Sequence, residues 1–257
     1  MFDAINLTTP TNKKYVSAQN SSCCYYDRHC YVFGGFDGEI ANNVLFKYSL
    51  VENTFEQLSP ANRPLPRYQH SACIVDEKMY IYGGKNDAEV FDDLWAYDFK
   101  ENRFTKIDYE YGRIRPSALY GHSAFAISPC EFMIIGGTKQ NTKPETVIYT
   151  YNIQTNIMTQ QLNQDGPAPA IGQSIIQMGD STYLFGGVGL KGFQADLWKY
   201  RNRKWTQVRV QKMGPLPRAF HGAARLGTDN FVIYGGENGV NSNQKLNDAW
   251  AFSIQTL

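Results

Sequence analysis

Three histidines and two carboxamide side chains recur at matching places along the chain and are the first candidates for chemistry. These residues are Asn20, His70, His122, Gln173 and His221. Three converging imidazoles could bind a metal ion. The position also accepts Asn and Gln and recurs in every repeat, which favours hydrogen bonding between neighbouring repeats instead. We therefore predict no metal ion and no cofactor.

A recurring glycine pair must position these side chains. The pairs begin at Gly34, Gly83, Gly136, Gly186 and Gly235, at intervals of 49 to 53 residues. Each follows a short β-branched and aromatic run, as in Tyr80-Ile81-Tyr82, which predicts a buried strand that ends at the glycines. A period near 50 over the whole length predicts an array of stacked repeats within a single domain, residues 1–257.

Each repeat contains segments typical of four antiparallel strands. The polar residue opens an inner strand A, and strand B ends at the glycines. An aromatic-x-aromatic segment, such as Trp95-Ala96-Tyr97, forms strand C, and a segment such as Phe55–Leu58 forms strand D. The fifth repeat stops before its strand D. Phe2 and Ile5 match Phe55 and Leu58, so we predict that residues 1–7 complete the last blade and close the ring.

The repeats resemble kelch repeats. The motifs are His-Ser-Ala at the inner strand, Tyr-x-Tyr-Gly-Gly at the second, and Asp-Leu-Trp-x-Tyr-Asp over 93–98. The third repeat departs most, with Thr-Val-Ile-Tyr at 146–149. The resemblance covers nearly the whole chain and implies a β-propeller of four-stranded blades. We therefore predict an all-β fold: a single five-bladed kelch-type propeller, closed by the N-terminal strand.

Composition limits the partners and the compartment. The net charge of +1 and the lack of a long apolar run predict neither nucleic-acid binding nor membrane insertion. The N-terminus resembles no secretory signal, and the five cysteines contain no Cys-x-x-Cys pair. We expect a cytoplasmic protein with reduced thiols, including Cys23 and Cys73, which align in adjacent inner strands. The oligomeric state is left open.

The kelch resemblance implies a protein-interaction role. We predict a non-enzymatic module or scaffold that binds its partner through the B–C and D–A loops at the mouth of the channel, where loops are long. The alternative is a propeller enzyme or metal-dependent protein acting on a small molecule or carbohydrate at the same mouth. No catalytic motif is found. The nearest match to an iron motif of similar propellers ends in Tyr97 instead of histidine.

Basic residues mark one sector of the expected loop face. Three consecutive D–A loops contribute seven positive charges: Lys13, Lys14, Arg63, Arg67, Arg209, Lys212 and Arg218. Arg67 and Arg218 each precede an inner-strand histidine by three residues, with Tyr68 and Phe220 beside them as apolar anchors. We expect these arginines to bind carboxylates or a phosphate of an acidic or phosphorylated partner segment. A self-neutralising, solvated loop surface is the alternative.

Overall fold

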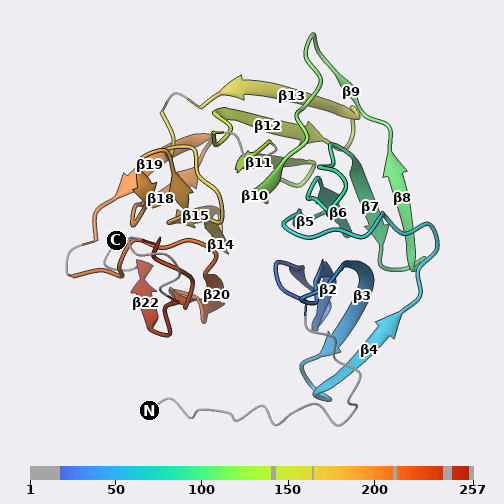
Figure 1. Cartoon of the computed structure of the whole chain (residues 1–257), viewed down its shortest axis with the longest axis horizontal. Helices are drawn as coiled ribbons and strands as arrows, with labels where there is room; N and C mark the ends of the chain where they lie inside the picture. The colour runs from blue at the N-terminus through green and yellow to red at the C-terminus, as the bar shows by residue number, and fades with distance from the viewer. Residues whose placement is uncertain (1–17, 140–142, 164, 211–212, 240–244, 255–257) are drawn as a thin grey trace.

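The computed structural model describes residues 18–139, 143–163, 165–210, 213–239 and 245–254. Five sheets stand side by side around a central axis, and the chain follows them in order (Figure 1). The predicted five-bladed propeller is confirmed. No helix among the described residues is long and apolar enough to cross a bilayer.

Within each blade the strands run antiparallel, in chain order from the axis outward. Blade 1 contains β1 (Ser22–Tyr26), β2 (His29–Phe36), β3 (Ala41–Ser49) and β4 (Thr54–Leu58). Blade 2 contains β5 (Ser71–Val75), β6 (Lys78–Tyr82), β7 (Leu94–Asp98) and β8 (Arg103–Ile107). Blade 3 contains β10 (Tyr120–Ser128), β11 (Glu131–Thr138), β12 (Val147–Asn152) and β13 (Ile157–Leu162), and β9 (Glu110–Tyr111) pairs in parallel with β13.

The last two blades follow the same plan. Blade 4 contains β14 (Ser174–Met178), β15 (Ser181–Phe185), β18 (Leu197–Arg201) and β19 (Lys204–Val208). A small hairpin, β16 (Val188–Gly189) and β17 (Gly192–Phe193), lies between its second and third strands. In the described residues blade 5 contains β20 (Gly222–Leu226), β21 (Asn230–Tyr234) and β22 (Ala249–Ser253). The expected fourth strand, residues 1–7, lies outside the described residues.

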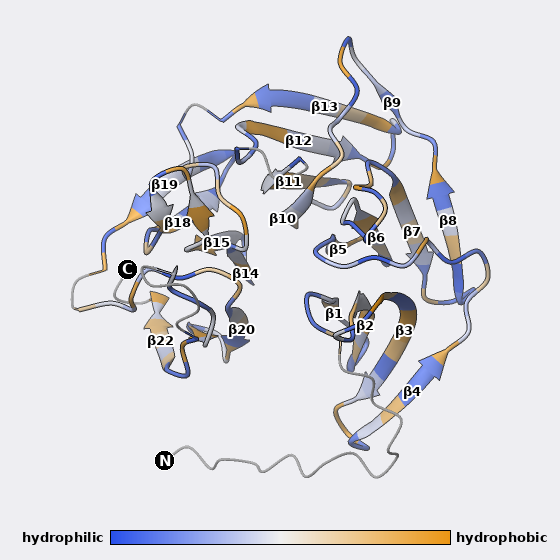
Figure 2. Ribbon diagram, viewed as in Figure 1, coloured by the Kyte–Doolittle hydropathy of each residue, from blue (hydrophilic) through white to orange (hydrophobic). Residues whose placement is uncertain are grey.

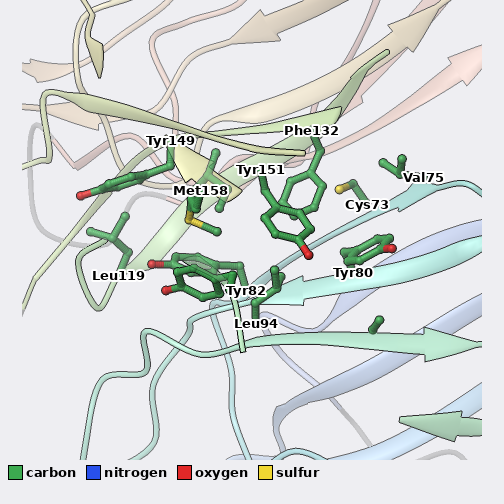
Figure 3. Close-up of a cluster of buried hydrophobic side chains, with 13 residues drawn as sticks. Cys73, Val75, Tyr80, Tyr82, Leu94, Leu119, Phe132, Tyr149, Tyr151 and Met158 are labelled. Carbon is green, nitrogen blue, oxygen red and sulfur yellow. The ribbon is translucent and has the colours of Figure 1, made fainter. Parts of the chain in front are cut away.

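The hydrophobic core consists of four clusters, one between each pair of consecutive blades. Figure 2 shows that apolar residues occur along the strands of the blades. Strand side chains alternate between the two faces of a sheet, so blades 2, 3 and 4 each present apolar residues to both neighbours. Between blades 2 and 3, Tyr82 and Leu94 pack with Phe132, Tyr149 and Met158 (Figure 3). Apolar burial between neighbours therefore holds the blades together.

The glycine pair allows neighbouring blades to approach closely. Gly83 has a φ of +60°, and a Cβ atom there would lie 2.6 Å from the carbonyl oxygen of Leu119 in the next blade. The amide of Gly84 donates to that same oxygen at 2.8 Å. A side chain at Gly83 would therefore force blades 2 and 3 apart.

The register of blade 1 differs from the expectation by one residue. Ser22 pairs with Phe33 as Ser71 pairs with Tyr82, so Ser21, and not Asn20, is the counterpart of His70. The sequence left this open because Asn20, Ser21 and Ser22 are all small and polar. The shift also makes Cys24, and not Cys23, the counterpart of Cys73. All five cysteines are free, as expected.

The connections form two faces. We call the face with the A–B and C–D turns the turn face, and the face with the B–C and D–A loops the loop face. The D–A loops also run beside the outer strand of the next blade. The amide of Phe104 donates to Ala61 at 3.0 Å, and the amide of Glu110 donates to Asn156 at 2.9 Å. These two loops are thus hydrogen-bonded to the blade that follows each of them.

We predict that residues 1–7 pair with the outer edge of β22, with Phe2 opposite Phe252 and Ile5 opposite Ala249. This register places Phe2 as Phe55 is placed opposite Tyr48 and Phe104 opposite Tyr97. Burying two such side chains is worth about 3–6 kcal/mol. The variant Phe2→Ala/Ile5→Ala should therefore melt at a clearly lower temperature in a thermal unfolding experiment.

The control is Asp3→Ala, which changes the side chain between these two positions and should leave the melting temperature nearly unchanged. Equal melting temperatures for the double variant and the wild type would show that this segment does not complete the blade.

Candidate protein-interaction face

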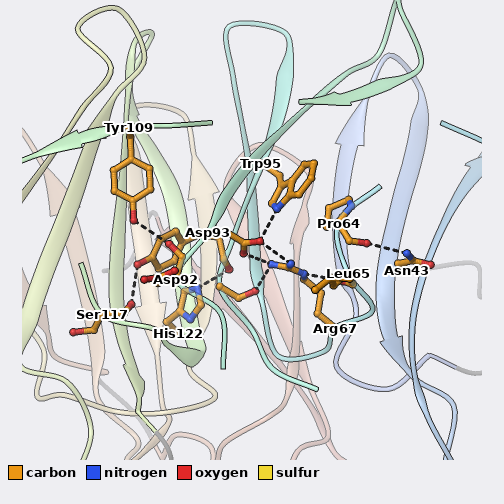
Figure 4. A network of polar contacts seen from close by, with 12 residues as sticks. Asn43, Pro64, Leu65, Arg67, Asp92, Asp93, Trp95, Tyr109, Ser117 and His122 are labelled. Atoms are coloured by element: carbon orange, nitrogen blue, oxygen red, sulfur yellow. Dashed lines mark hydrogen bonds and ion pairs between the residues drawn. The ribbon is translucent and has the colours of Figure 1, made fainter. Parts of the chain in front are cut away.

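Two loops on the loop face share the tetrapeptide Pro-Leu-Pro-Arg, at 64–67 before blade 2 and at 215–218 before blade 5. Each arginine binds an aspartate of its own blade with both arms of its guanidinium. The Nη1 and Nη2 atoms of Arg67 lie 2.6 and 3.0 Å from the Asp93 carboxylate oxygens (Figure 4). For Arg218 and Asp248 the distances are 2.7 and 2.8 Å. This paired geometry is the strongest that arginine makes with a carboxylate.

The remaining donors of Arg67 bind backbone. Its Nη1 also donates to the Gly83 carbonyl at 2.9 Å, and its Nε donates to the Leu65 carbonyl at 3.1 Å. The Trp95 indole donates to Asp93 at 2.7 Å, and the guanidinium lies 4.1 Å from the centre of the Phe91 ring. One side chain thus joins the loop, the glycine pair and strand β7.

Blade 5 repeats this arrangement. Arg218 donates to the carbonyl oxygens of Gly235 at 2.9 Å and Leu216 at 3.1 Å. The Trp250 indole donates to Asp248 at 2.6 Å.

Hydrogen bonds from Arg218 and Trp250 hold the pKa of Asp248 well below its usual range. At Asp93 burial raises the pKa, but hydrogen bonds from Arg67 and Trp95 outweigh it and leave the pKa lowered. Both aspartates are therefore ionised at neutral pH.

The expectation that Arg67 and Arg218 bind a partner's carboxylate or phosphate is wrong. Both side chains are 0% exposed, and their forks are already occupied by Asp93 and Asp248. Fewer of the predicted cations are therefore available to a partner. Of its seven cations these two are neutralised, and Lys13, Lys14 and Lys212 lie outside the described residues. Arg63 and Arg209 are the two that the described residues place at the surface.

The leucines of the two loops point outward. Leu65 is 56% exposed and Leu216 is 53% exposed. Each lies between two prolines, and its carbonyl oxygen accepts a hydrogen bond from Nε of the buried arginine. Proline fixes φ and so restricts the loop further. The sequence argument missed these leucines. The signal that could have found them is the repeated tetrapeptide itself.

Tyr68 and Phe220 precede the inner strands β5 and β20, and their role as partner contacts stays a prediction. The amide of Phe220 donates to Gly172 of blade 4 at 2.8 Å. The rings of Tyr68 and Phe36 have centres 5.3 Å apart, and the Lys85 ammonium lies 5.3 Å from the centre of the Tyr68 ring. A backbone bond to the neighbouring blade therefore fixes Phe220, and contacts with Phe36 and Lys85 hold the Tyr68 ring.

A cavity of about 340 Å³ opens beside the Arg67 cluster, and its lining includes Asp93 and Tyr111. Its rim contains an ion pair in which Arg115 Nε lies 2.7 Å from Asp92. The buried Tyr109 hydroxyl donates to the Asp92 carbonyl at 2.9 Å and supports this wall. The loop face thus combines two exposed leucines, the aromatic residues Tyr68 and Phe220, and a cavity lined mainly by polar residues.

The polar side chains of the inner strands bind groups of the preceding blade, as expected in part: two bind backbone carbonyls and two bind serine hydroxyls. His70 Nε2 lies 2.9 Å from the Ser22 hydroxyl, and His221 Nε2 lies 2.7 Å from that of Ser174. His122 binds the Tyr82 carbonyl at 3.1 Å, and Gln173 binds the equivalent Ile135 carbonyl, also at 3.1 Å. No group of three metal-ligating side chains occurs among the described residues.

Burial keeps these histidines neutral. It lowers the pKa of His70 to about 3 and the pKa values of His122 and His221 to about 4. In the unfolded chain each titrates near pH 6.5. Below that pH the unfolded state binds protons that the folded state excludes, so stability falls as the pH drops from about 6.5 toward 4.

We predict that His122→Gln flattens this dependence, because Gln173 already fills the equivalent position with the same bond. Each such histidine contributes up to about 1.4 kcal/mol of lost stability per pH unit in the window. Urea unfolding of the wild type and the variant at pH 7, 6 and 5 measures the difference in slope. Parallel curves would show that His122 is not held neutral.

We also predict that Arg67→Ala destabilises the fold by about 3–5 kcal/mol, because Asp93, 14% exposed, would be left buried without its partner. Arg218→Ala should cost less stability, since Asp248 is 38% exposed and can be solvated.

Blade 3 supplies a control for Arg67→Ala, because Leu119 and Val147 occupy the positions of Arg67 and Asp93. The double variant Arg67→Leu/Asp93→Val should therefore recover most of the lost stability in urea titrations. A double variant as unstable as Arg67→Ala would contradict this account.

Comparison with known proteins agrees with the geometry. Residues 4–114 and 110–257 match the family model described as the KLHDC2/KLHL20/DRC7 Kelch-repeats domain. Rho GTPase-activating protein gacHH of Dictyostelium discoideum is 27% identical over 146 residues, 54% of this chain and 9% of that protein. Human Kelch domain-containing protein 10 is 25% identical over 135 residues, 51% of this chain and 30% of that protein.

A third relative, Protein ral2 of Schizosaccharomyces pombe, is 32% identical over 114 residues, 40% of this chain and 18% of that protein. The chain therefore matches less than a third of the length of each of these relatives. The similarity concerns the repeats and says nothing about the rest of those proteins.

Proposed function

The chain belongs to the kelch-repeat family, and we propose that it is a non-enzymatic interaction module whose loop face binds a partner protein. Propellers of this family are commonly protein-interaction modules. The observation that carries the proposal is the pair of Pro-Leu-Pro loops. Each is held by a buried arginine, and each presents a leucine that is more than half exposed. Side chains held in place before binding lose little entropy when a partner covers them.

The proposal changes the chemistry expected of the partner. With Arg67 and Arg218 paired internally, apolar contacts to Leu65 and Leu216 replace the arginine contacts as the main source of affinity. Tyr68 and the partly exposed Phe220 at the channel mouth extend this apolar surface toward the axis. Aromatic residues of this kind are enriched at the centres of interfaces.

Charged residues fit a second role at the rim. Arg63 is exposed beside the first Pro-Leu-Pro loop. Lys13, Lys14 and Lys212 lie outside the described residues and remain predicted partner contacts. Cations at a rim influence the rate of encounter more than the final affinity. A partner with an apolar segment flanked by acidic residues would match this arrangement.

We predict that Leu65→Ser/Leu216→Ser weakens partner binding by about 3 kcal/mol or more, because burying each leucine is worth about 1.5–3 kcal/mol. Affinity purification from the native cell, with quantitative mass spectrometry, should show partners retained by the wild type and lost by this variant. Isothermal titration with the identified partner then gives the affinity change.

Leu50→Ser is the matched control, because Leu50 is a similarly exposed leucine, at 49%, in a C–D turn of the opposite face. It should retain the same partners as the wild type. Partners that survive the double variant and disappear with Leu50→Ser would place the interaction on the turn face.

A further inference from the structure

Each Pro-Leu-Pro loop packs against the B–C hairpin of the preceding blade. The amide of Arg67 donates to the Asn42 carbonyl of blade 1 at 3.0 Å, and the amide of Arg218 donates to the Gln194 carbonyl of blade 4, also at 3.0 Å. Both acceptors follow the tip of their hairpin at the same distance along the chain. The same contact therefore occurs at two places in the ring, on opposite sides of the central axis (Figure 1).

Each hairpin tip adds an exposed aliphatic side chain to this contact. The tips are residues 37–40 in blade 1 and residues 189–192 in blade 4. Ile40 and Leu190 are 62% and 68% exposed, so each is at least as exposed as the leucine of the neighbouring loop. We call Ile40 and Leu65 the first pair, and Leu190 and Leu216 the second pair. The loop face thus has two apolar surfaces of the same construction.

The two hairpin tips carry opposite charges at the same position. The third residue of the tip is Glu39 in blade 1 and Lys191 in blade 4. Both residues are exposed, and the ion pairs among the described residues include neither of them. Each charge is therefore open to a partner beside its apolar pair.

The wider surroundings of the first pair are acidic. Tyr68 pairs with Lys85, which places the hairpin tip of blade 2, residues 86–89, on the other side of the Leu65 loop. The two tips that flank this loop contribute four exposed carboxylates outside the described ion pairs, whereas Arg63 and Lys85 are the two cations. The carboxylates belong to Asp37, Glu39, Asp87 and Glu89.

Around the second pair, cations outnumber carboxylates. Lys191 and Arg209 are exposed and belong to no described ion pair. The carboxylate of Glu237, on the other side of the Leu216 loop, is bound by Lys245 at 2.6 Å. Asp196 is then the one carboxylate outside the ion pairs in the described part of these loops. A chain that contacts both pairs meets negative charge at one end and positive charge at the other.

We propose that the loop face binds one extended segment of a partner protein whose two ends differ in charge. At one end an apolar residue flanked by Lys or Arg covers the first pair, and at the other end an apolar residue flanked by Asp or Glu covers the second pair. This inference rests on the loop-face function proposed above and restricts the acidic flank to the second pair. A reversed segment brings like charges together, which is costly, so the charges fix the direction in which the segment lies.

Panning a phage-displayed library of random linear peptides on the immobilised full chain tests the proposal. Enriched peptides should contain two apolar residues, with Lys or Arg beside one and Asp or Glu beside the other. Fluorescence anisotropy with a labelled synthetic peptide of the most enriched sequence then gives its affinity. Leu65→Ser/Leu216→Ser should abolish binding of this peptide, because the variant removes one aliphatic side chain from each pair.

Glu39→Lys/Asp87→Lys reverses the charge around the first pair. It leaves Asp37 in place, because that carboxylate accepts hydrogen bonds from the amides of Glu39 and Ile40 at 2.9 Å and holds the tip. The variant should bind the peptide at least about tenfold more weakly. A second peptide, in which Glu replaces the basic residue, should recover the lost affinity.

Glu52→Lys/Glu101→Lys is the matched control, because it reverses two exposed carboxylates in C–D turns of the turn face. It should bind the first peptide with wild-type affinity. Lys191→Glu supplies the corresponding change at the second pair and should weaken binding of the first peptide. A peptide in which Lys replaces the acidic residue should restore the affinity of this variant.

Three results would overturn the proposal. One is the absence of any enriched peptide whose binding depends on Leu65 and Leu216. Another is enrichment of peptides with the same charge at both ends or with no charge. The third is wild-type affinity of both Glu39→Lys/Asp87→Lys and Lys191→Glu for the peptide. If the leucine double variant still loses its cellular partners, these results refute the charge arrangement alone, whereas retention of those partners refutes the loop-face function itself.

Discussion

The close approach of one blade's glycine pair to the next blade's backbone is the constraint on which the rest of this structure depends. In all four joints the second glycine donates to the carbonyl of the residue three positions before the next blade's polar ring residue, at 2.8 to 2.9 Å. A Cβ atom on the first glycine would lie within 2.6 Å of that oxygen. Blade spacing, core packing and loop position therefore follow from a contact that only glycine permits.

The buried arginines act on this same contact. The carbonyl oxygens of Arg67 and Arg218 accept the glycine bond from the preceding blade, while their side chains bind the glycine carbonyl and the aspartate of their own blade. Each arginine thus joins two blades and a loop at one point. Blade 3 forms the same backbone contact with Leu119, so the ion pair is an addition to the joint and not a requirement of it. What the arginine adds is a fixed loop with an outward-facing leucine.

Comparison of the blades also shows which residues differ from those at the equivalent positions of the other blades. Because four joints share one plan, Thr182 stands out against the methionine and phenylalanines at its position, and Gln173 stands out against the histidines of the polar ring. Both departures preserve the structure. Gln173 makes the same hydrogen bond as His122. Thr182 is accompanied by the buried Phe125, which stands where the other blades have Cys24, Cys73 and Ile176 and packs against Tyr200 in the same joint.

The sequence by itself determined the blade count, the strand order and the separation of the loop and turn faces, because these depend on short-range patterns. Alternation sets the face of each side chain, and the glycine period sets each blade. It also predicted Tyr68 and Phe220 as apolar anchors, since both are neighbours of the inner strands, and this role stays a prediction. The one-residue error at Asn20 arose where three small polar residues follow one another and no pattern distinguishes them.

Only the tertiary structure decided what the charged residues do. Arg67 and Asp93 are 26 residues apart, and Arg218 and Asp248 are 30 apart, so the sequence shows a cation near the channel mouth but not the anion that neutralises it. The joint between blades 3 and 4 combines Phe125 of one blade with Tyr200 and Trp205 of the next. Ion pairing and packing volume depend on distances between residues far apart in the chain, and the folded arrangement of the blades sets those distances.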